Sequence, residues 1–450
     1  MEDETGVESV SRQIESEFQK LKFTQTAGNS HYASRGPEDL EQRNASVVGF
    51  LQDDSRIEPL VGPTFHDPSF IQEAIAKYET MLDVLTSQSP RSDEDEMLID
   101  KLIDKTGELF RYEELMHAAG AVALEDREAR RRVASDLSAE LIGGIDQAYF
   151  DGILYDLRDL AAHSQLAIAK ELLERIGEPH LEEARIIELE DHARELIKQD
   201  LVDLYPGLQE LIDRATMVGE TVSPQDAVPL FQELLRIAGL DSEWTVELKS
   251  GGRSAETSSS RKVVYIGERR ASFKNGLDAL AVGFHEAIVH AGRAQGVSLP
   301  GYLDFEEGIA TLLQQVISGE KRTPGVQYYL SIGLQLGMDR SEPRSYRDTF
   351  EILWRREALL MDRDGKEVDI EKARVQAQRQ VHRTRRGGAV DTRDAAYFVG
   401  AQKAAAWLNG ISELPAEERR QVLRLALSHR ADPTLQHHVS YIEKQADVQA

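Results

Sequence analysis

Two histidines and a glutamate lie within one short segment of this 450-residue chain, as His285, Glu286 and His290. Glu307 follows in what the sequence predicts to be the next helix. Two imidazoles and a carboxylate can bind one zinc ion and leave its fourth position open for water. Glu286, beside the first imidazole, could take a proton from that water as a general base. These residues therefore predict a catalytic zinc site with His285, His290 and Glu307 as ligands.

The spacing of the two histidines is unusual for a metal site on a helix. Five residues turn a regular α-helix by about 500°, which would leave the two rings about 140° apart. A π-bulge widens one turn to an i→i+5 hydrogen bond, and such bulges occur often at functional sites. We therefore predict a widened turn between His285 and His290 that lets both imidazoles converge. The alternative is a regular buried helix that carries two unrelated histidines.

Several elements are predicted to position this motif. Two strand-like runs at residues 244–248 and 262–266 precede it and are joined by a polar Gly/Ser loop. A Gly/Pro turn after the motif leads into a second apolar-sided helix that begins near residue 304. The motif itself lies in a segment whose apolar residues recur at helical spacing and predict a buried helix: Leu277, Leu280, Ala281, Phe284 and Ile288.

Glu306 and Glu307 form an acidic pair in the first turn of the second helix. Carboxylates at a helix N-terminus are favoured by the helix dipole without any further role. We assign this simple role to Glu306. We assign the role of metal ligand to Glu307, because the site otherwise lacks a third ligand.

At this point the chain resembles a known family, the flavohemoglobin-expression-modulating QEGLA-motif proteins, which are related to the microtubule-associated tyrosine carboxypeptidases of animals. The resemblance covers about residues 240–410. It rests on the strand pair, on the His-Glu-x-x-x-His motif, and on Glu-Glu-Gly-Ile-Ala at 306–310 in place of the family's Gln-Glu-Gly-Leu-Ala. It continues with Tyr346, Phe350 and Leu353, and it ends with Arg-Gly-Gly at 386–388 and Thr-Arg-Asp-x-x-Tyr-x-x-Gly at 392–400.

The resemblance implies a zinc metallopeptidase with the same ligands and with Glu286 as the base. It also implies that the phenol of Tyr397 lies near the zinc and can donate a hydrogen bond to a developing oxyanion. The substrate would be cut near its C-terminus.

This chain departs from the family pattern at three positions, where Glu306 replaces Gln, Ile309 replaces Leu and Arg393 replaces Lys. None of these changes removes a ligand or the base. The change at position 393 bears on substrate contacts rather than on metal binding.

The formal net charge of −26 disfavours nucleic acid as a partner, because affinity for nucleic acid comes largely from Lys and Arg contacts to phosphate. One basic segment, residues 372–393, runs against this trend. Arginine can hold a carboxylate through two parallel hydrogen bonds. We therefore predict that Arg385, Arg386 and Arg393 bind the carboxylate of a peptide C-terminus. The alternative is a solvated helix end.

The chain has no cysteine, so it has no disulfide framework. No run approaches the 18–20 apolar residues that a membrane span needs, and the acidic N-terminus lacks the basic and apolar regions of a signal peptide. We expect a cytoplasmic protein with no membrane partner.

The predicted fold class is α+β and predominantly helical. We expect a flexible acidic arm at residues 1–65, a helical region at 66–240, and a zinc metallopeptidase-like catalytic region at 241–450. In the catalytic region, a small β-sheet would lie beside the active-site helix.

The predicted reaction is zinc-dependent hydrolysis of a peptide bond, and the resemblance implies that it is of the carboxypeptidase kind. Two other functions remain open from the sequence. One is a regulatory pseudoenzyme that binds zinc without turnover, and the other is a zinc amidase or deacylase that acts on a small molecule. The intact Glu286 argues against the pseudoenzyme, because a site without turnover has no need of a base.

Overall fold

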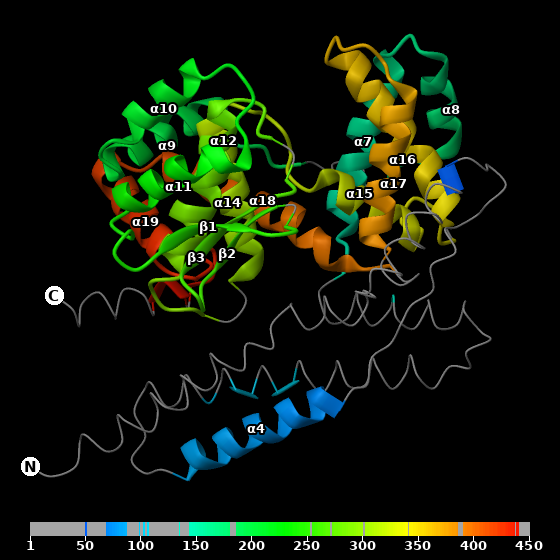
Figure 1. Ribbon diagram of the computed structural model, residues 1–450. Coiled ribbons are helices and arrows are strands. Elements are labelled where there is room, and N and C mark those ends of the chain that lie inside the picture. The colour runs from blue at the N-terminus through cyan, green and yellow to red at the C-terminus, as the bar shows by residue number, and fades with distance from the viewer. Residues whose placement is uncertain are drawn as a thin grey trace, which may run out of the picture. The chain divides into compact units, whose positions relative to one another are not determined.

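The computed structural model describes a large part of the chain (Figure 1). The described residues are 50–51, 69–87, 99, 102–103, 106–107, 135, 144–180, 186–252, 254–270, 272–299, 302–340, 342–385, 390–436 and 438–440. They are mostly helical, with one small sheet, as the sequence predicts. Contacts divide the chain into two compact units, Met1–Ile186 with Val326–Ala395, and Ile187–Gly325 with Ala396–Ala450. We call them the first unit and the second unit.

The helices of the first unit confirm part of the predicted helical pattern. Within the helical region expected at residues 66–240, α4 is present. Residues 149–175 fall in two helices, because the hydroxyl of Ser164 accepts a hydrogen bond from the Leu166 backbone and the chain turns there. Most of residues 96–110 lie outside the described residues. The elements are α4 (Ser69–Thr86), α7 (Gln147–His163), α8 (Ala167–Arg175), α15 (Val326–Leu336), α16 (Tyr346–Arg363), α17 (Ile370–Thr384) and η3 (Thr392–Asp394).

The second unit contains the predicted metal-binding motif. Its helix α19 ends at Ser428, and residues 436 and 438–440 are again helical. None of the described helices combines the length and the hydropathy that a membrane crossing would need. The helices are α9 (Asp191–Leu204), α10 (Leu208–Met217), α11 (Pro224–Ile237), α12 (Gly276–Gly283), η1 (Phe284–His290), α13 (Ala291–Arg293), α14 (Leu303–Ser318), α18 (Ala395–Ser412) and α19 (Ala416–Ser428).

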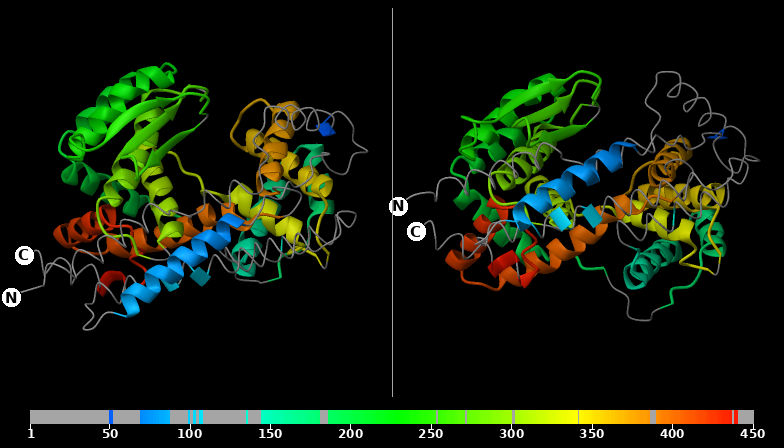
Figure 2. Two further views of the ribbon diagram at one scale, coloured as in Figure 1. Left: turned by 60° about the horizontal axis from the view of Figure 1, so that its bottom comes forward. Right: turned by 90° about the horizontal axis from the view of Figure 1, so that it is seen from below.

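A three-stranded sheet lies beside the motif helix in the order β1-β3-β2 (Figure 2). Strands β1 (Thr245–Lys249) and β3 (Val263–Gly267) are the two predicted runs, and they pair in parallel. The predicted Gly/Ser loop contains a third strand, β2 (Ala255–Ser258), which is antiparallel to β3. The sequence prediction missed β2 because its residues Ala-Glu-Thr-Ser lack the apolar alternation of a strand, and backbone pairing with β3 holds it instead.

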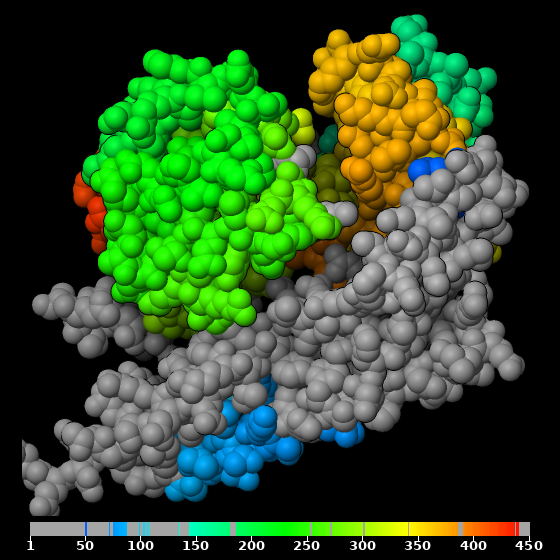
Figure 3. Space-filling view, in the orientation of Figure 1, coloured from blue at the N-terminus to red at the C-terminus, as the bar shows by residue number. Residues whose placement is uncertain are grey.

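The boundary predicted at residue 240 does not coincide with the boundary between the units. Helices α9, α10 and α11 precede residue 240, yet they share one core with α12 and η1. The contact is close, since a Cβ atom on Gly283 would lie 2.7 Å from side-chain atoms of Phe231 and Leu234. In the space-filling view, α10, α11 and the sheet, in green, cover the second unit on the viewer's side (Figure 3). Helical periodicity indicates which face of these helices is buried, but it does not identify the surface that each face covers.

Candidate metal centre

The motif helix widens where the spacing of the histidines requires it. The segment Phe284–His290 is a π-helix, continuous with α12 before it and α13 after it. The Nε2 atoms of His285 and His290 lie 3.1 Å apart, and their ring centroids are 4.8 Å apart. The predicted widened turn is confirmed, and the alternative of two unrelated histidines on a regular helix is wrong.

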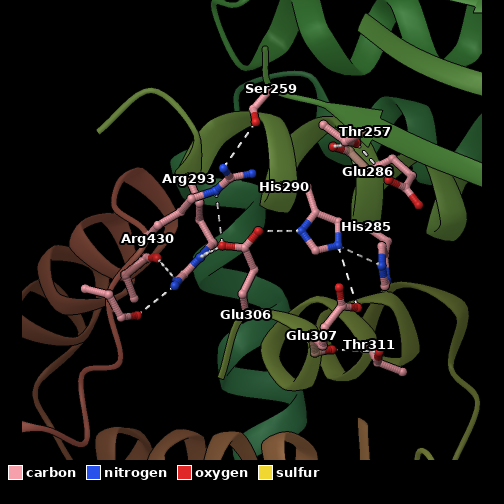
Figure 4. Close-up of polar contacts among 12 residues, drawn as sticks. Thr257, Ser259, His285, Glu286, His290, Arg293, Glu306, Glu307, Thr311 and Arg430 are labelled. Carbon is pink, nitrogen blue, oxygen red and sulfur yellow. Dashed lines mark hydrogen bonds and ion pairs between the residues drawn. The ribbon is translucent and has the colours of Figure 1, made fainter. Parts of the chain in front are cut away.

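Glu307 completes a group that could hold a metal ion. It comes from the first turns of α14, and its Oε2 atom lies 4.0 Å from Nε2 of His290 (Figure 4). The ligand atoms of His285, His290 and Glu307 all lie within 4.8 Å of one another. Two nitrogens bound to one tetrahedral ion at 2.0–2.1 Å would lie about 3.3 Å apart, close to the separation in this structure. The side chain of Glu307 is 25% exposed, so it has room to approach such an ion.

The two histidines have opposite electrostatic environments. Burial and the neighbouring charge of His290 lower the pKa of His285 to about 4. Burial also disfavours the charged form of His290, but the hydrogen bond that its ring donates to Glu306 and the charge of Glu307 outweigh burial and raise the pKa of His290 to about 9. These opposite shifts favour the protonated form for His290 and the neutral form for His285. The protonated His290 can donate from Nε2 to the neutral His285.

Glu286 is buried on the same π-helix, with an exposed fraction of 7%. The hydroxyl of Thr257, on β2, lies 2.7 Å from its Oε2 atom and 3.0 Å from its backbone oxygen. Burial raises the pKa of the Glu286 carboxyl group, while His290 and Thr257 act in the opposite direction. A carboxylate in this setting is more basic than one in water, which suits a residue that accepts a proton.

Glu306 lies in the first turn of α14, as predicted, but it also makes contacts that the simple role does not include. Its carboxylate is 3% exposed, and Oε1 lies 2.8 Å from Nδ1 of His290. Burial alone would raise the pKa of Glu306, but His290 and the charges of Arg430 and Arg293 lower it to about 2. An acidic residue in the first turn of a helix gives no sequence signal for such contacts, because all of its partners come from other elements.

The predicted substrate-binding arginines belong to the first unit, except that Arg386 lies outside the described residues. Arg385 caps the end of α17. Arg393 forms an ion pair with Asp391, and its Nε atom lies 3.2 Å from Asp391 Oδ1. Substrate binding by these three arginines stays a prediction.

Tyr397 lies in the first turn of α18, within the second unit. Its helix is brought against α14, since a Cβ atom on Gly308 would lie 2.0 Å from the backbone of Gly400. Gly308 directly follows the candidate ligand Glu307. The helix that carries Tyr397 therefore lies next to the helix that carries a candidate ligand, and the role of its phenol stays a prediction.

The sequence prediction also missed a guanidinium group close to Glu286. Arg270, in the turn after β3, stacks on the ring of Phe273 with its Cζ atom 4.5 Å from the ring centroid. It interacts electrostatically with both Asp278 and Glu286, and burial lowers its pKa. Its Nε atom is buried and meets no hydrogen-bond acceptor among the described residues. Only the fold brings this arginine to the helix of the motif, so the sequence offered no signal for it.

Comparison with protein-family models, with curated proteins and with solved structures finds no match to this chain in any of the three.

Proposed function

We propose that this protein is a zinc-dependent peptide hydrolase of the carboxypeptidase kind. One observation carries the proposal. His285, His290 and Glu307 converge within 4.8 Å of one another, and a buried carboxylate, Glu286, adjoins the first of them. This arrangement provides three ligands and a base, which are the protein groups of a hydrolytic zinc site.

Zinc is the metal that the donor set favours, since two imidazoles and one carboxylate are the ligands of several catalytic zinc sites. When bound, zinc would polarise a carbonyl group and lower the pKa of a water molecule towards neutrality. His285 and His290 would present their Nε2 atoms to the ion, and Glu307 would present a carboxylate oxygen. The short separation of the two nitrogens supports this ligand set.

Glu286 would act as the general base. It would take a proton from the attacking water and pass that proton to the leaving amine. Thr257 supports this role, because its hydroxyl occupies one carboxylate oxygen and so limits rotation of the side chain. Tyr397 would donate a hydrogen bond to the oxyanion that forms on the substrate.

The expected substrate is the C-terminus of a peptide or protein. This choice rests on the family resemblance and on the arginines that could hold a terminal carboxylate, Arg385, Arg386 and Arg393. A zinc amidase or deacylase would use the same ligands and the same base. The ligand set is therefore the same for a peptidase and for an amidase or deacylase, and substrate profiling distinguishes them.

The test is metal analysis followed by substrate profiling of the purified protein. We expect about one zinc per chain and hydrolysis of peptides with free C-termini in a library that also contains blocked peptides and simple amides. Removal of zinc with a chelator should abolish hydrolysis, and added zinc should restore it. A zinc-loaded protein that cleaves none of these compounds would favour the regulatory pseudoenzyme, and a protein that binds no metal would refute the site.

A further inference from the structure

The ring of His290 is held from both sides. Its Nε2 atom faces the candidate metal site and lies 3.1 Å from Nε2 of His285. Its Nδ1 atom lies 2.8 Å from Oε1 of Glu306, on the other side of the ring (Figure 4). An ionised carboxylate can only accept hydrogen bonds, so Nδ1 must carry the hydrogen. In the neutral ring this leaves the lone pair on Nε2, the nitrogen that faces the site.

The second oxygen of Glu306 is held by two arginines. Arg293 donates a hydrogen bond from Nε to Oε2 of Glu306 at 3.4 Å, while Nε of Arg430 lies 3.4 Å from the same oxygen as an ion pair without hydrogen-bond geometry. The carboxylate is therefore divided between one histidine, through Oε1, and two guanidinium groups, through Oε2. With both oxygens occupied, the side chain of Glu306 has little freedom to turn away from His290. We call Glu306, Arg293 and Arg430 the carboxylate clamp.

The two arginines of the clamp are themselves anchored. Arg293 is fully buried, and it donates hydrogen bonds to the backbone oxygens of Ala426 and Ala431, the latter at 2.7 Å. Arg430 donates to the hydroxyl of Ser259, just after β2, at 3.3 Å. The clamp thus fixes Glu306 relative to the end of α19, the segment that follows it and the sheet.

His285 has no equivalent support. Its Nδ1 atom is buried and meets no hydrogen-bond acceptor among the described residues. The side chain of Gln314 favours the charged form of this ring, but burial and the charge of His290 outweigh it, so the pKa of His285 is lowered. The two ligands therefore differ, and the clamp acts on His290 alone.

We propose that Glu306 is a positioning residue of the metal centre, which fixes the tautomer and the orientation of His290 while Arg293 and Arg430 hold Glu306 in place. The proposal rests on the metal site of the proposed function. A carboxylate that accepts a hydrogen bond from the second ring nitrogen of a metal-binding histidine orients that ring, and loss of the carboxylate typically weakens metal binding by about 10–100-fold. Glu306 would not touch the metal, the substrate or the reacting atoms.

The test compares three variants by zinc affinity, measured by competition with a chelator. Glu306→Leu removes the acceptor, and Glu306→Gln keeps an oxygen acceptor but loses the charge. Asp200→Asn is the matched control, because Asp200 forms a buried ion pair with Arg419 in the same unit. We expect zinc affinity to fall by about 10–100-fold in Glu306→Leu, to fall less in Glu306→Gln, and to stay unchanged in Asp200→Asn.

Nitrogen-15 NMR of zinc-loaded protein gives a readout that a purely structural role would not change. The wild type and Glu306→Gln should show His290 bound to zinc through Nε2, with a slowly exchanging hydrogen on Nδ1. If Glu306→Leu fails to fold, the zinc affinity of Glu306→Gln tests the proposal instead, and an affinity equal to that of the wild type would contradict it. Binding through Nδ1, or rapid exchange of that hydrogen, in the zinc-loaded wild type would overturn the proposal.

Two further outcomes separate this proposal from the proposed function. A folded Glu306→Leu variant with wild-type zinc affinity would remove the role of Glu306 and leave the metal site intact. An equal loss of affinity in Asp200→Asn would show that any weakened core loosens the site, which also contradicts a specific role. A wild-type protein that binds no zinc would instead refute the metal site, and the positioning role with it.

Discussion

Gly308 and Gly400 bring α14 and α18 into backbone contact. A Cβ atom on Gly308 would lie 2.0 Å from the carbonyl carbon of Gly400, and one on Gly400 would lie 1.8 Å from the backbone oxygen of Asp304. Real side chains cannot approach so closely, so only glycine permits this contact. Gly308 follows the candidate ligand Glu307, and Gly400 lies one turn after Tyr397. The approach of the two helices therefore helps to place a candidate ligand.

Gly308→Ala should destabilise the protein and weaken zinc binding, because the added methyl group must push α14 away from α18. Forced insertion into a packed contact typically costs about 1–3 kcal/mol. Gly410→Ala, also on α18, is the control, since a Cβ atom there meets nothing within 4 Å. Chemical denaturation would measure both variants. Equal stability of Gly308→Ala and the wild type would contradict the close contact.

Glu286→Gln should bind zinc and fold normally but lose hydrolysis, because a carboxamide cannot accept the proton from water. Loss of a general base typically lowers the rate by about 10²–10⁴-fold. Zinc content, thermal unfolding and the rate on the best library substrate would be measured together. Turnover at the wild-type rate would show that Glu286 is not the base, even if the protein is a hydrolase.

Glu307→Gln should differ from Glu286→Gln, because it should lose zinc rather than the general base. A neutral amide replaces an anionic ligand, so the purified variant should be poor in zinc and should partly recover hydrolysis in excess zinc. A His285→Ala/His290→Ala double variant should lose zinc more completely. The exposed residues His163 and His192 provide a control, and their double alanine variant should keep about one zinc per chain. Full zinc retention in Glu307→Gln would exclude this carboxylate as a ligand.

Zinc affinity should rise with pH between about 6 and 9. The pKa of His290 is raised to about 9 in the side-chain cluster, so zinc must displace a proton from this ring below that pH. The pKa of His285 is lowered to about 4, so this ring is already neutral in that range and adds no pH dependence. We expect about tenfold weaker binding for each pH unit below 9, and a plateau above it. Chelator competition at fixed pH values would measure this, and constant affinity from pH 6 to 8 would contradict the raised pKa.

Arg385→Ala or Arg386→Ala should raise KM for peptides with a free C-terminus by about tenfold or more, as expected for lost hydrogen bonds to a charged group. Blocked peptides should be unaffected. Arg270→Ala is an informative comparison, because Arg270 lies near Glu286 in the second unit. If Arg270→Ala alone produces the effect, the carboxylate is held beside the motif helix, and the prediction for Arg385 and Arg386 is wrong.

Local periodicity was enough to predict several elements of this protein. Strands β1 and β3 and helix α4 lie where apolar residues alternate or recur at helical spacing. The widened turn followed from geometry alone, because His285 and His290 can meet on one helix only if a turn is expanded. Each of these features depends on residues that are close together in the chain.

Contacts between distant segments could not be predicted in this way. Strand β2 carries Thr257 to Glu286, although its sequence lacks a strand pattern. Helices α9 to α11 share a core with the motif helix, although they lie before the boundary expected at residue 240.

The sequence by itself determined the types of the candidate ligands, the spacing of the two histidines and the turn that lets them converge, because the spacing and the turn depend on the local geometry of one helix. Tertiary structure alone decided the environment of those ligands. Glu306 has the sequence signature of an ordinary helix N-terminus, yet burial beside His290, Arg293 and Arg430 gives it a different role. The physical reason is that the pKa and the hydrogen bonds of a side chain depend on its neighbours in space. The neighbours of Glu306 come from distant parts of the chain. Arg430, for example, is 124 residues away along the chain (430 minus 306).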